Sequence, residues 1–292
     1  MKKFIRHFAE GLKMTYEITD RDISLPKRKR NAHKGDFGRI LLLCGSEKYS
    51  GAAFFSAQAA VNTGSGLVFL SVSERLRPIL SAKLNEPIII SRKIKNFRCD
   101  AELIGCGLGL SSKSRRLVLS ELSKEGAPLV VDADAITLLA RSGFDLSKSP
   151  RELILTPHEG EFLRLVPDFE SSRREEFAGN FAKQNGVTLV LKGHRTITAA
   201  KDGKLDINTN GNPGMAKGGS GDVLSGIIVS LLGQGICAEK AAYTGVWLHG
   251  AAGDSAARKF GEYAMTPTDM LRELKSVLCE VEHSLEAPRN NF

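Results

Sequence analysis

The stretch from Asn208 to Gly226, NTNGNPGMAKGGSGDVLSG, holds the residues of this chain that are best suited to chemistry. It contains six glycines and two side chains that can react or bind, Lys217 and Asp222. Apolar residues recur at helical spacing after Asp222, so we expect a glycine loop that runs into the N-terminus of a helix. The N–H groups of such a loop and the helix dipole favour an anion. The pattern therefore predicts a phosphate site, with Asp222 as a base toward a substrate hydroxyl.

The alternative is a glycine-rich connection in which Asp222 only caps the helix. A single GxGD motif would favour this alternative, but the density of glycine over the whole stretch favours the anion site. We therefore predict that Asp222 is catalytic and that the backbone of Gly218, Gly219, Ser220 and Gly221 holds the phosphoryl group.

Four other segments with polar or glycine residues follow apolar, strand-like runs. They are GCGLG at 105–109, Asp132 with Asp134, TPHEGE at 156–161 and LKGHRT at 191–196. The first is not the GxGxxG fingerprint of dinucleotide-binding folds, because Leu110 stands where the third glycine of that fingerprint is needed. Ligands of open α/β sheets bind beyond the carboxyl ends of the strands, so we expect these loops to meet at one edge.

Each of these segments also has a plainer interpretation. Asp132 and Asp134 either hold a metal-bound water or cap a helix that begins near Ala135, and we favour the cap. A lone histidine is usually structural, but the position of His158 on this edge favours binding. Lys192 and Thr196 are placed to meet nucleotide phosphates. Small residues at Gly51–Ala53 bring a helix close either to a ligand or to the sheet, and the sequence leaves both open.

The apolar runs alternate between strands and helices along the chain. We expect strands at 39–44, 66–72, 101–104, 128–132, 153–156, 187–191 and 197–200, the last two forming a hairpin across Gly193. We expect helices at 51–62, 117–122, 238–259 and 268–277, and others that begin near 135, 159 and 222. Continuous apolar strands are typical of buried parallel sheets. The chain is thus predicted to be one α/β domain, with a mainly parallel sheet and helices on both faces.

Composition narrows the class of protein. Of 292 residues, 42% are hydrophobic and 25% are charged, as in ordinary globular proteins, and the net charge is +8. The basic residues lack interleaved aromatics, which favours an anionic nucleotide ligand over nucleic acid. Five widely spaced cysteines without a CxxC pair suggest a reducing cytoplasm. We expect no membrane span, because no run reaches about 18 apolar residues, and a disordered tail from Ser284.

Five motifs together resemble one known family. HKGDFGRILLLCGS, GCGLG, TPHEGE, LKGHRT and NPGMAKGGSGDVLSG occur in the order and spacing of the ADP/ATP-dependent NAD(P)H-hydrate dehydratases, which are ribokinase-like. The resemblance covers roughly residues 25–278, which suggests an N-terminal extension at 1–24, a dehydratase domain at 25–280 and a C-terminal tail at 281–292. Many relatives carry an N-terminal epimerase, which we expect to be a separate protein here. Cys106 departs from the family, where proline is frequent.

The resemblance implies a repair enzyme that dehydrates the 6-hydroxylated forms of NADH and NADPH. ADP or ATP would phosphorylate the hydroxyl, Asp222 would act as base, and Mg²⁺ is expected although no metal ligands can be assigned. The residues implied for the hydrate are Gly51, Ala52, Gly107, Gly109, His158 and Asp222. Those implied for the adenine nucleotide are Lys192, Gly193, His194, Arg195, Thr196, Gly218, Gly219, Ser220 and Gly221. Relatives also suggest a homo-oligomer, such as a tetramer.

Two other functions remain open from sequence. A vitamin-precursor or sugar kinase of the same superfamily would share the GxGD loop and stop at a phosphorylated product. A nucleotide sensor without catalysis would share the binding loops. The first is disfavoured by the combination of HKGDFG with TPHEGE, and the second by the position of Asp222.

Overall fold

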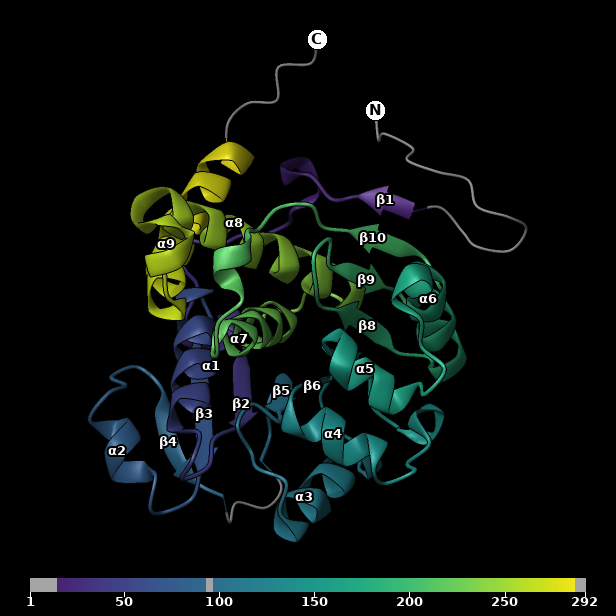
Figure 1. The fold of residues 1–292 in the computed structure, drawn as a ribbon. Helices are drawn as coiled ribbons and strands as arrows, with labels where there is room; N and C mark the ends of the chain where they lie inside the picture. Colours follow the sequence, from purple (N-terminus) through teal and green to yellow (C-terminus); the bar gives the residue numbers. More distant parts are fainter. Residues whose placement is uncertain (1–14, 93–96, 287–292) are drawn as a thin grey trace.

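A ten-stranded sheet lies at the centre of the protein in the computed structural model, which describes residues 15–92 and 97–286 (Figure 1). The strands lie in the order β1-β10-β9-β8-β7-β6-β5-β2-β3-β4. Their bounds are β1 Thr15–Glu17, β2 Arg39–Leu43, β3 Leu67–Val72, β4 Ile88–Ser91, β5 Ala101–Ile104, β6 Leu129–Val131, β7 Leu153–Leu155, β8 Thr188–Leu191, β9 Ile197–Ala199 and β10 Leu205–Ile207.

The sheet is parallel except at β9, which runs antiparallel to both β8 and β10. The mainly parallel α/β fold and the β8–β9 hairpin are therefore confirmed. Strands β1, β4 and β10 were not predicted. Two of them have only three residues, too few to show a periodic pattern. β1 lies in the segment assigned to the N-terminal extension, and it pairs with β10 at the edge of the sheet.

Helices cover both faces of the sheet (Figure 1). Their bounds are α1 Ser50–Asn62, α2 Arg77–Ser81, α3 Ser112–Ser123, α4 Asp134–Ala140, α5 Glu159–Leu165, α6 Arg174–Asn185, α7 Ser220–Gly233, α8 Ala238–Ala264 and α9 Pro267–Glu286. Short 3₁₀ turns occupy Asp20–Asp22, Lys34–Phe37, Leu146–Lys148, Ser171–Arg173 and Pro213–Met215.

Side chains that point alternately to the two faces of the sheet build two hydrophobic cores. Ile40 and Leu42 of β2 pack into the core beneath α1, α7, α8 and α9. Leu41 and Leu43, on the opposite face of the same strand, pack into the core beneath α3, α4, α5 and α6. Because side chains of a strand alternate between faces, one continuous apolar run supplies both layers.

Several predicted boundaries are corrected by the structure. α8 and α9 extend beyond 259 and 277, and α6 was not predicted. The prediction of disorder from Ser284 is wrong as far as Glu286, because α9 continues to that residue. Residues 1–14 of the predicted N-terminal extension and residues 287–292 of the predicted tail lie outside the described residues. Among residues 15–92 and 97–286, no helix is long and apolar enough to cross a membrane.

Helix α7 is the most buried helix next to the predicted site, and it packs closely on α1. At Gly226 a Cβ atom would lie 2.3 Å from the backbone oxygen of Ser56 and 2.7 Å from the Cβ of Ala59. Both are helical positions of α1, so neither atom can move without shifting that helix. Gly226 thus sets the distance between the helix that carries the glycine loop and its neighbour.

We predict that Gly226→Ala lowers the free energy of unfolding by about 1–3 kcal/mol, because overpacked cores lose that amount. The measurement is chemical denaturation followed by circular dichroism. Gly51→Ala is the matched control. Its added Cβ would have Phe55 as nearest neighbour at 3.9 Å, so stability should stay equal or rise slightly. Equal stability of Gly226→Ala and wild type would contradict the packing described here.

Candidate functional site

A buried ion pair joins two strand ends at the edge where the predicted loops meet. The Lys192 ammonium, just after β8, donates to Asp132 Oδ1 at 2.8 Å, just after β6. Asp132 is 1% exposed and the Lys192 side chain 18%. Burial alone would raise the pKa of Asp132, but the charge and hydrogen bond of Lys192 lower it. Burial likewise opposes the charge on Lys192, yet Asp132 and then Glu161 raise its pKa.

The cap predicted for Asp132 and Asp134 is wrong. Helix α4 follows Ala133, which has a φ of 51°, and no side chain caps it. Asp132 instead accepts hydrogen bonds from Lys192 and from the Ser225 hydroxyl of α7, the latter at 2.7 Å. Asp134 Oδ2 accepts from the Gly109 N–H at 2.7 Å. Both carboxylates therefore hold neighbouring loops together, because the parallel strands bring those loops to the same edge.

Asp222 lies in the first turn of α7, close to this ion pair. Its pKa is raised to about 7, first by burial and then by the negative charge of Asp132. A hydrogen bond from Cys106 and the charge of Lys192 act in the opposite direction. A carboxyl with a pKa near 7 is a stronger base than an ordinary aspartate and is still ionised in part at neutral pH.

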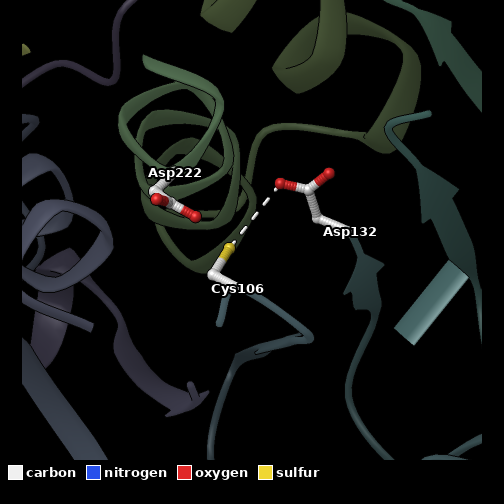
Figure 2. Close-up of side chains that lie close together, drawn as sticks. All are labelled: Cys106, Asp132 and Asp222. Atoms are coloured by element: carbon white, nitrogen blue, oxygen red, sulfur yellow. Dashed lines mark hydrogen bonds between the residues drawn. The ribbon is translucent and has the colours of Figure 1, made fainter. Parts of the chain in front are cut away.

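The Cys106 thiol completes a cluster with the two acids. Figure 2 shows the three side chains turned toward one another. One ligand atom of each lies within 4.8 Å of the others, and the thiol donates to Asp132 Oδ2 at 3.6 Å. Such spacing would suit a metal.

Two features argue against a resident magnesium in this cluster. The Lys192 ammonium already takes the place of a cation beside Asp132. The pKa of the thiol is raised well above its usual value by Cys44, by burial and by the two acids, so Cys106 stays protonated. Magnesium also prefers oxygen ligands to sulfur. These residues do not fit a resident magnesium ion.

The residues predicted for the hydrate lie on two adjoining loops. A Cβ at Gly107 would lie 2.7 Å from the Cβ atoms of both Ala52 and Tyr49, so the GCGLG turn contacts the start of α1. Gly109 is tied to Asp134 and lies near Ser46. Gly51, next to Ala52, is exposed at the first turn of α1. The close approach of helix and turn is therefore observed, and contact with a ligand stays a prediction.

The glycine loop forms the N-terminus of α7 as predicted. Gly219 is the N-cap with a φ of 103°, a left-handed conformation that favours glycine, and it lies against the Phe55 ring. Gly218 has open space at its Cβ position, and a Cβ at Gly221 would have only the Lys192 Nζ near it, at 3.4 Å. The loop is therefore open at Gly218, and at Gly221 it lies next to the Lys192 ammonium.

Two polar side chains of the loop point elsewhere. Lys217 donates to the carbonyls of Tyr263 and Met265 at the end of α8, so it anchors the loop instead of joining the cluster. The Ser220 hydroxyl lies 3.2 Å from His249 Nε2 in the interior, and the Ser220 N–H donates to the Lys217 carbonyl at 3.2 Å, so Ser220 shapes the loop. Burial lowers the pKa of His249 to about 4, so this histidine is neutral at ordinary pH.

His158 is both structural and accessible. It is the N-cap of α5, where its Nδ1 accepts from the Glu161 N–H at 3.1 Å in a capping box. Its side chain is nevertheless 55% exposed. A parallel bridge between His158 and Lys192 brings the TPHEGE and LKGHRT loops together. From sequence, a binding histidine and a structural histidine are alternatives. The two roles are compatible, because His158 caps α5 while more than half of its side chain stays exposed.

The rest of the predicted nucleotide segment makes different contacts from Lys192. Gly193 has a φ of 154° in the turn, and Thr196 donates to its carbonyl at 2.9 Å. His194 offers its carbonyl to Arg174, and Arg195 lies 3.4 Å from Glu17. None of these contacts involves the glycine loop. A shared nucleotide surface thus stays a prediction for residues 193–196, while Lys192 reaches the cluster.

Sequence patterns missed part of this site. Ser225 gave no signal, since one serine on an apolar helix is common. Cys106 was noted only as a departure from the proline that is frequent in the family. Asp132 was recognised as a strand-end acid, but its partner Lys192 is 60 residues away in the chain.

The chain matches the model of the NAD(P)H-hydrate dehydratase family over residues 40–276. An ADP-dependent (S)-NAD(P)H-hydrate dehydratase of Listeria monocytogenes is 34% identical over 268 residues, which are 87% of this chain and 92% of that protein. A bifunctional NAD(P)H-hydrate repair enzyme of Moorella thermoacetica is 39% identical over 90% of this chain. The chain spans 53% of that enzyme, and thus about half the length of this bifunctional relative.

Solved structures give the same result. The ADP/ATP-dependent NAD(P)H-hydrate dehydratase of Bacillus subtilis, co-crystallised with ATP/Mg²⁺, superposes with a TM-score of 0.83 at 29% identity. The match covers 90% of this chain and 97% of that one. Both the family match and the relatives span most of the chain, including every loop of the site described above. The chain therefore belongs to the NAD(P)H-hydrate dehydratase family.

Proposed function

We propose that this chain dehydrates the hydrated forms of NADH and NADPH, using ADP or ATP to phosphorylate the hydroxyl that must leave. The observation that carries this proposal is the position of Asp222, a half-buried carboxyl with a pKa of about 7 beside a glycine loop at a helix N-terminus. A base next to an anion site is what phosphoryl transfer to a hydroxyl requires. Similarity to named dehydratases supports the choice of substrate.

In the first step Asp222 accepts the proton of the 6-hydroxyl while that oxygen attacks the terminal phosphoryl group of the nucleotide. A new P–O bond forms and the bond to AMP or ADP breaks. The N–H groups at Gly218–Gly221 and the dipole of α7 stabilise the negative charge on the phosphoryl group. Lys192 lies next to Gly221 and adds positive charge at the same place.

In the second step phosphate leaves in place of hydroxide, which is a much poorer leaving group. The electron pair of the ring nitrogen expels it, and loss of a proton from the adjacent carbon restores the dihydropyridine. Magnesium enters with the nucleotide as part of the substrate, where it neutralises phosphate charge. The chain's own contribution is then the base, the anion loop and the exclusion of water.

Three wider features of the proposal stay predictions. They are a separate epimerase as functional partner, a homo-oligomeric state such as a tetramer, and a cytoplasmic location. The bifunctional relatives support the first, because they carry about as much chain again beside the part that matches. Mass measurement of the native protein would test the second.

The deciding experiment is incubation of the protein with NADH-hydrate or NADPH-hydrate and either ADP or ATP. Return of reduced-nicotinamide absorbance, with release of phosphate, supports the proposal. A stable phosphoester would instead identify a kinase, and nucleotide binding without turnover would identify a sensor. Either of those outcomes overturns the dehydratase assignment.

We predict that Asp222→Asn lowers kcat by about 10²–10⁴-fold, the usual contribution of a general base. Nucleotide affinity should persist or increase, since the loop is unchanged and one negative charge near the phosphates is gone. The measurement is kcat together with calorimetric affinity for ADP. Turnover within a few-fold of wild type would show that Asp222 is only part of the helix terminus.

We also predict that Asp222→Asn changes the stability of the protein. The pKa of Asp222 rises from about 4 in the unfolded chain to about 7 when folded, so its ionisation opposes folding as the pH rises through that range. Asp222→Asn should therefore be more stable than wild type by on the order of 1–3 kcal/mol at pH 8. The gain should be smaller at pH 5. Denaturation at both pH values measures it, and a gain that does not depend on pH would contradict the raised pKa.

For His158 we predict a separation of binding from capping. His158→Ala should raise KM for the hydrate more than KM for ADP, and should also cost about 0.5–2 kcal/mol of stability through the lost cap. His158→Asn keeps an N-cap acceptor, so it should restore stability without restoring KM. Steady-state kinetics and thermal unfolding of both variants test this. Normal hydrate KM in both would leave His158 with a structural role alone.

A further inference from the structure

Cys106 is the group in the cluster to which the reaction described above assigns no role. It lies in the turn between β5 and α3, and it is fully buried. The flanking glycines hold it in place. A Cβ at Gly105 would overlap the backbone oxygen of Asp132, and Gly107 is pressed against the start of α1. The sulfur therefore has little freedom to move away from the two acids (Figure 2).

The thiol acts as a hydrogen-bond donor at this position. It donates to Asp132 Oδ2 at 3.6 Å, and a carboxylate oxygen of Asp222 lies within 4.8 Å of the sulfur, so the thiol hydrogen can turn toward either acid. It holds a single hydrogen, so only one acid can receive that hydrogen at a time. Asp132 has two better donors, the Lys192 ammonium and the Ser225 hydroxyl. If the thiol is removed, Asp132 therefore still accepts its two stronger hydrogen bonds.

We propose that Cys106 is a positioning residue whose thiol hydrogen turns to Asp222 when that acid ionises. While Asp222 is protonated, the thiol donates to Asp132. Asp132 already accepts hydrogen bonds from Lys192 and Ser225. When Asp222 has lost its proton, its carboxylate therefore gains more from the thiol hydrogen than Asp132 does, and the thiol turns to Asp222. The thiol thus stabilises the ionised base, which is the form that catalysis requires.

Other charged and titratable groups face the same cluster, and they set the background against which the thiol acts. They are Asp132 after β6, Asp134 at the start of α4, Glu161 of α5, Lys192 after β8, Cys44 after β2 and His249 of α8. Among them, Asp132 and Asp134 oppose ionisation of Asp222, and Lys192 favours it. Cys106 is the uncharged group that favours it.

The inference rests on the proposed function for its kinetic test, which compares kcat/KM against pH for three variants. In wild type the acid limb should lie near pH 7. Cys106→Ala should move that limb upward by roughly 0.5–1 pH unit, a modest shift because S–H is a weak donor. Activity below the limb then falls about three- to tenfold, while the plateau at high pH is unchanged.

Two variants serve as controls. Cys106→Ser keeps a hydroxyl donor at the same place, so its limb should stay close to that of wild type. Cys44→Ala removes the neighbouring buried thiol, which interacts with Cys106 but is not among the groups that shift the pKa of Asp222, and it leaves the Cys106 hydrogen in place. It should affect stability without moving the limb. Coincident profiles for Cys106→Ala and wild type would overturn the proposal, as would equal shifts for Cys106→Ala and Cys44→Ala.

A second measurement needs no turnover. The loss of unfolding free energy between pH 4 and pH 9 should be larger in Cys106→Ala than in wild type, because the folded-state pKa of Asp222 rises further. In an Asp222→Asn background, Cys106→Ala should lower the free energy of unfolding by the same amount at every pH. A pH-dependent cost in that background would assign the effect to another acid and overturn the proposal. Absence of dehydration by wild type would overturn only the proposed function.

Discussion

The buried ion pair between Lys192 and Asp132 is the interaction on which the site depends. It joins the ends of β8 and β6 across the intervening strand β7, and the Ser225 hydroxyl adds α7 to the same carboxylate. Removing either partner would leave a lone charge in a water-poor place, which typically costs several kcal/mol. The pair therefore holds three elements in register. It also keeps a fixed negative charge beside Asp222 and a fixed positive charge beside Gly221.

Helix α7 supplies both halves of the proposed chemistry from one N-terminal turn. Its backbone and dipole suit a phosphoryl group, whereas Asp222 in the same turn suits a proton. An ionised carboxylate at this end of a helix would normally have a lowered pKa. Here burial and Asp132 outweigh the helix, and the pKa rises to about 7. Close packing on α1 through Gly226 and Gly219 keeps this turn from relaxing toward solvent.

Most polar side chains of the loops around this turn hold neighbouring segments in place. Asp134 binds the backbone of Gly109, Lys217 binds the end of α8, and His158 caps α5 while it bridges to Lys192. In the proposed function, ligand contacts are therefore assigned mainly to backbone groups, to Asp222 and to exposed parts of such anchoring residues. Rigid support of this kind limits the reorganisation that a charged transition state would otherwise require.

By itself the sequence determined the α/β class, most central strands, the glycine loop at the start of α7 and the place of Asp222 in the first turn of that helix. These follow from local patterns, because a strand, a helix start or a glycine turn is encoded within a few neighbouring residues. Only the tertiary structure decided that Asp132 pairs with Lys192, that Cys106 lies between two acids and that Ser220 and Lys217 turn away from the site. Those facts join residues far apart in the chain. Their energies depend on burial and on distances between charges, which exist only after the strands are placed side by side.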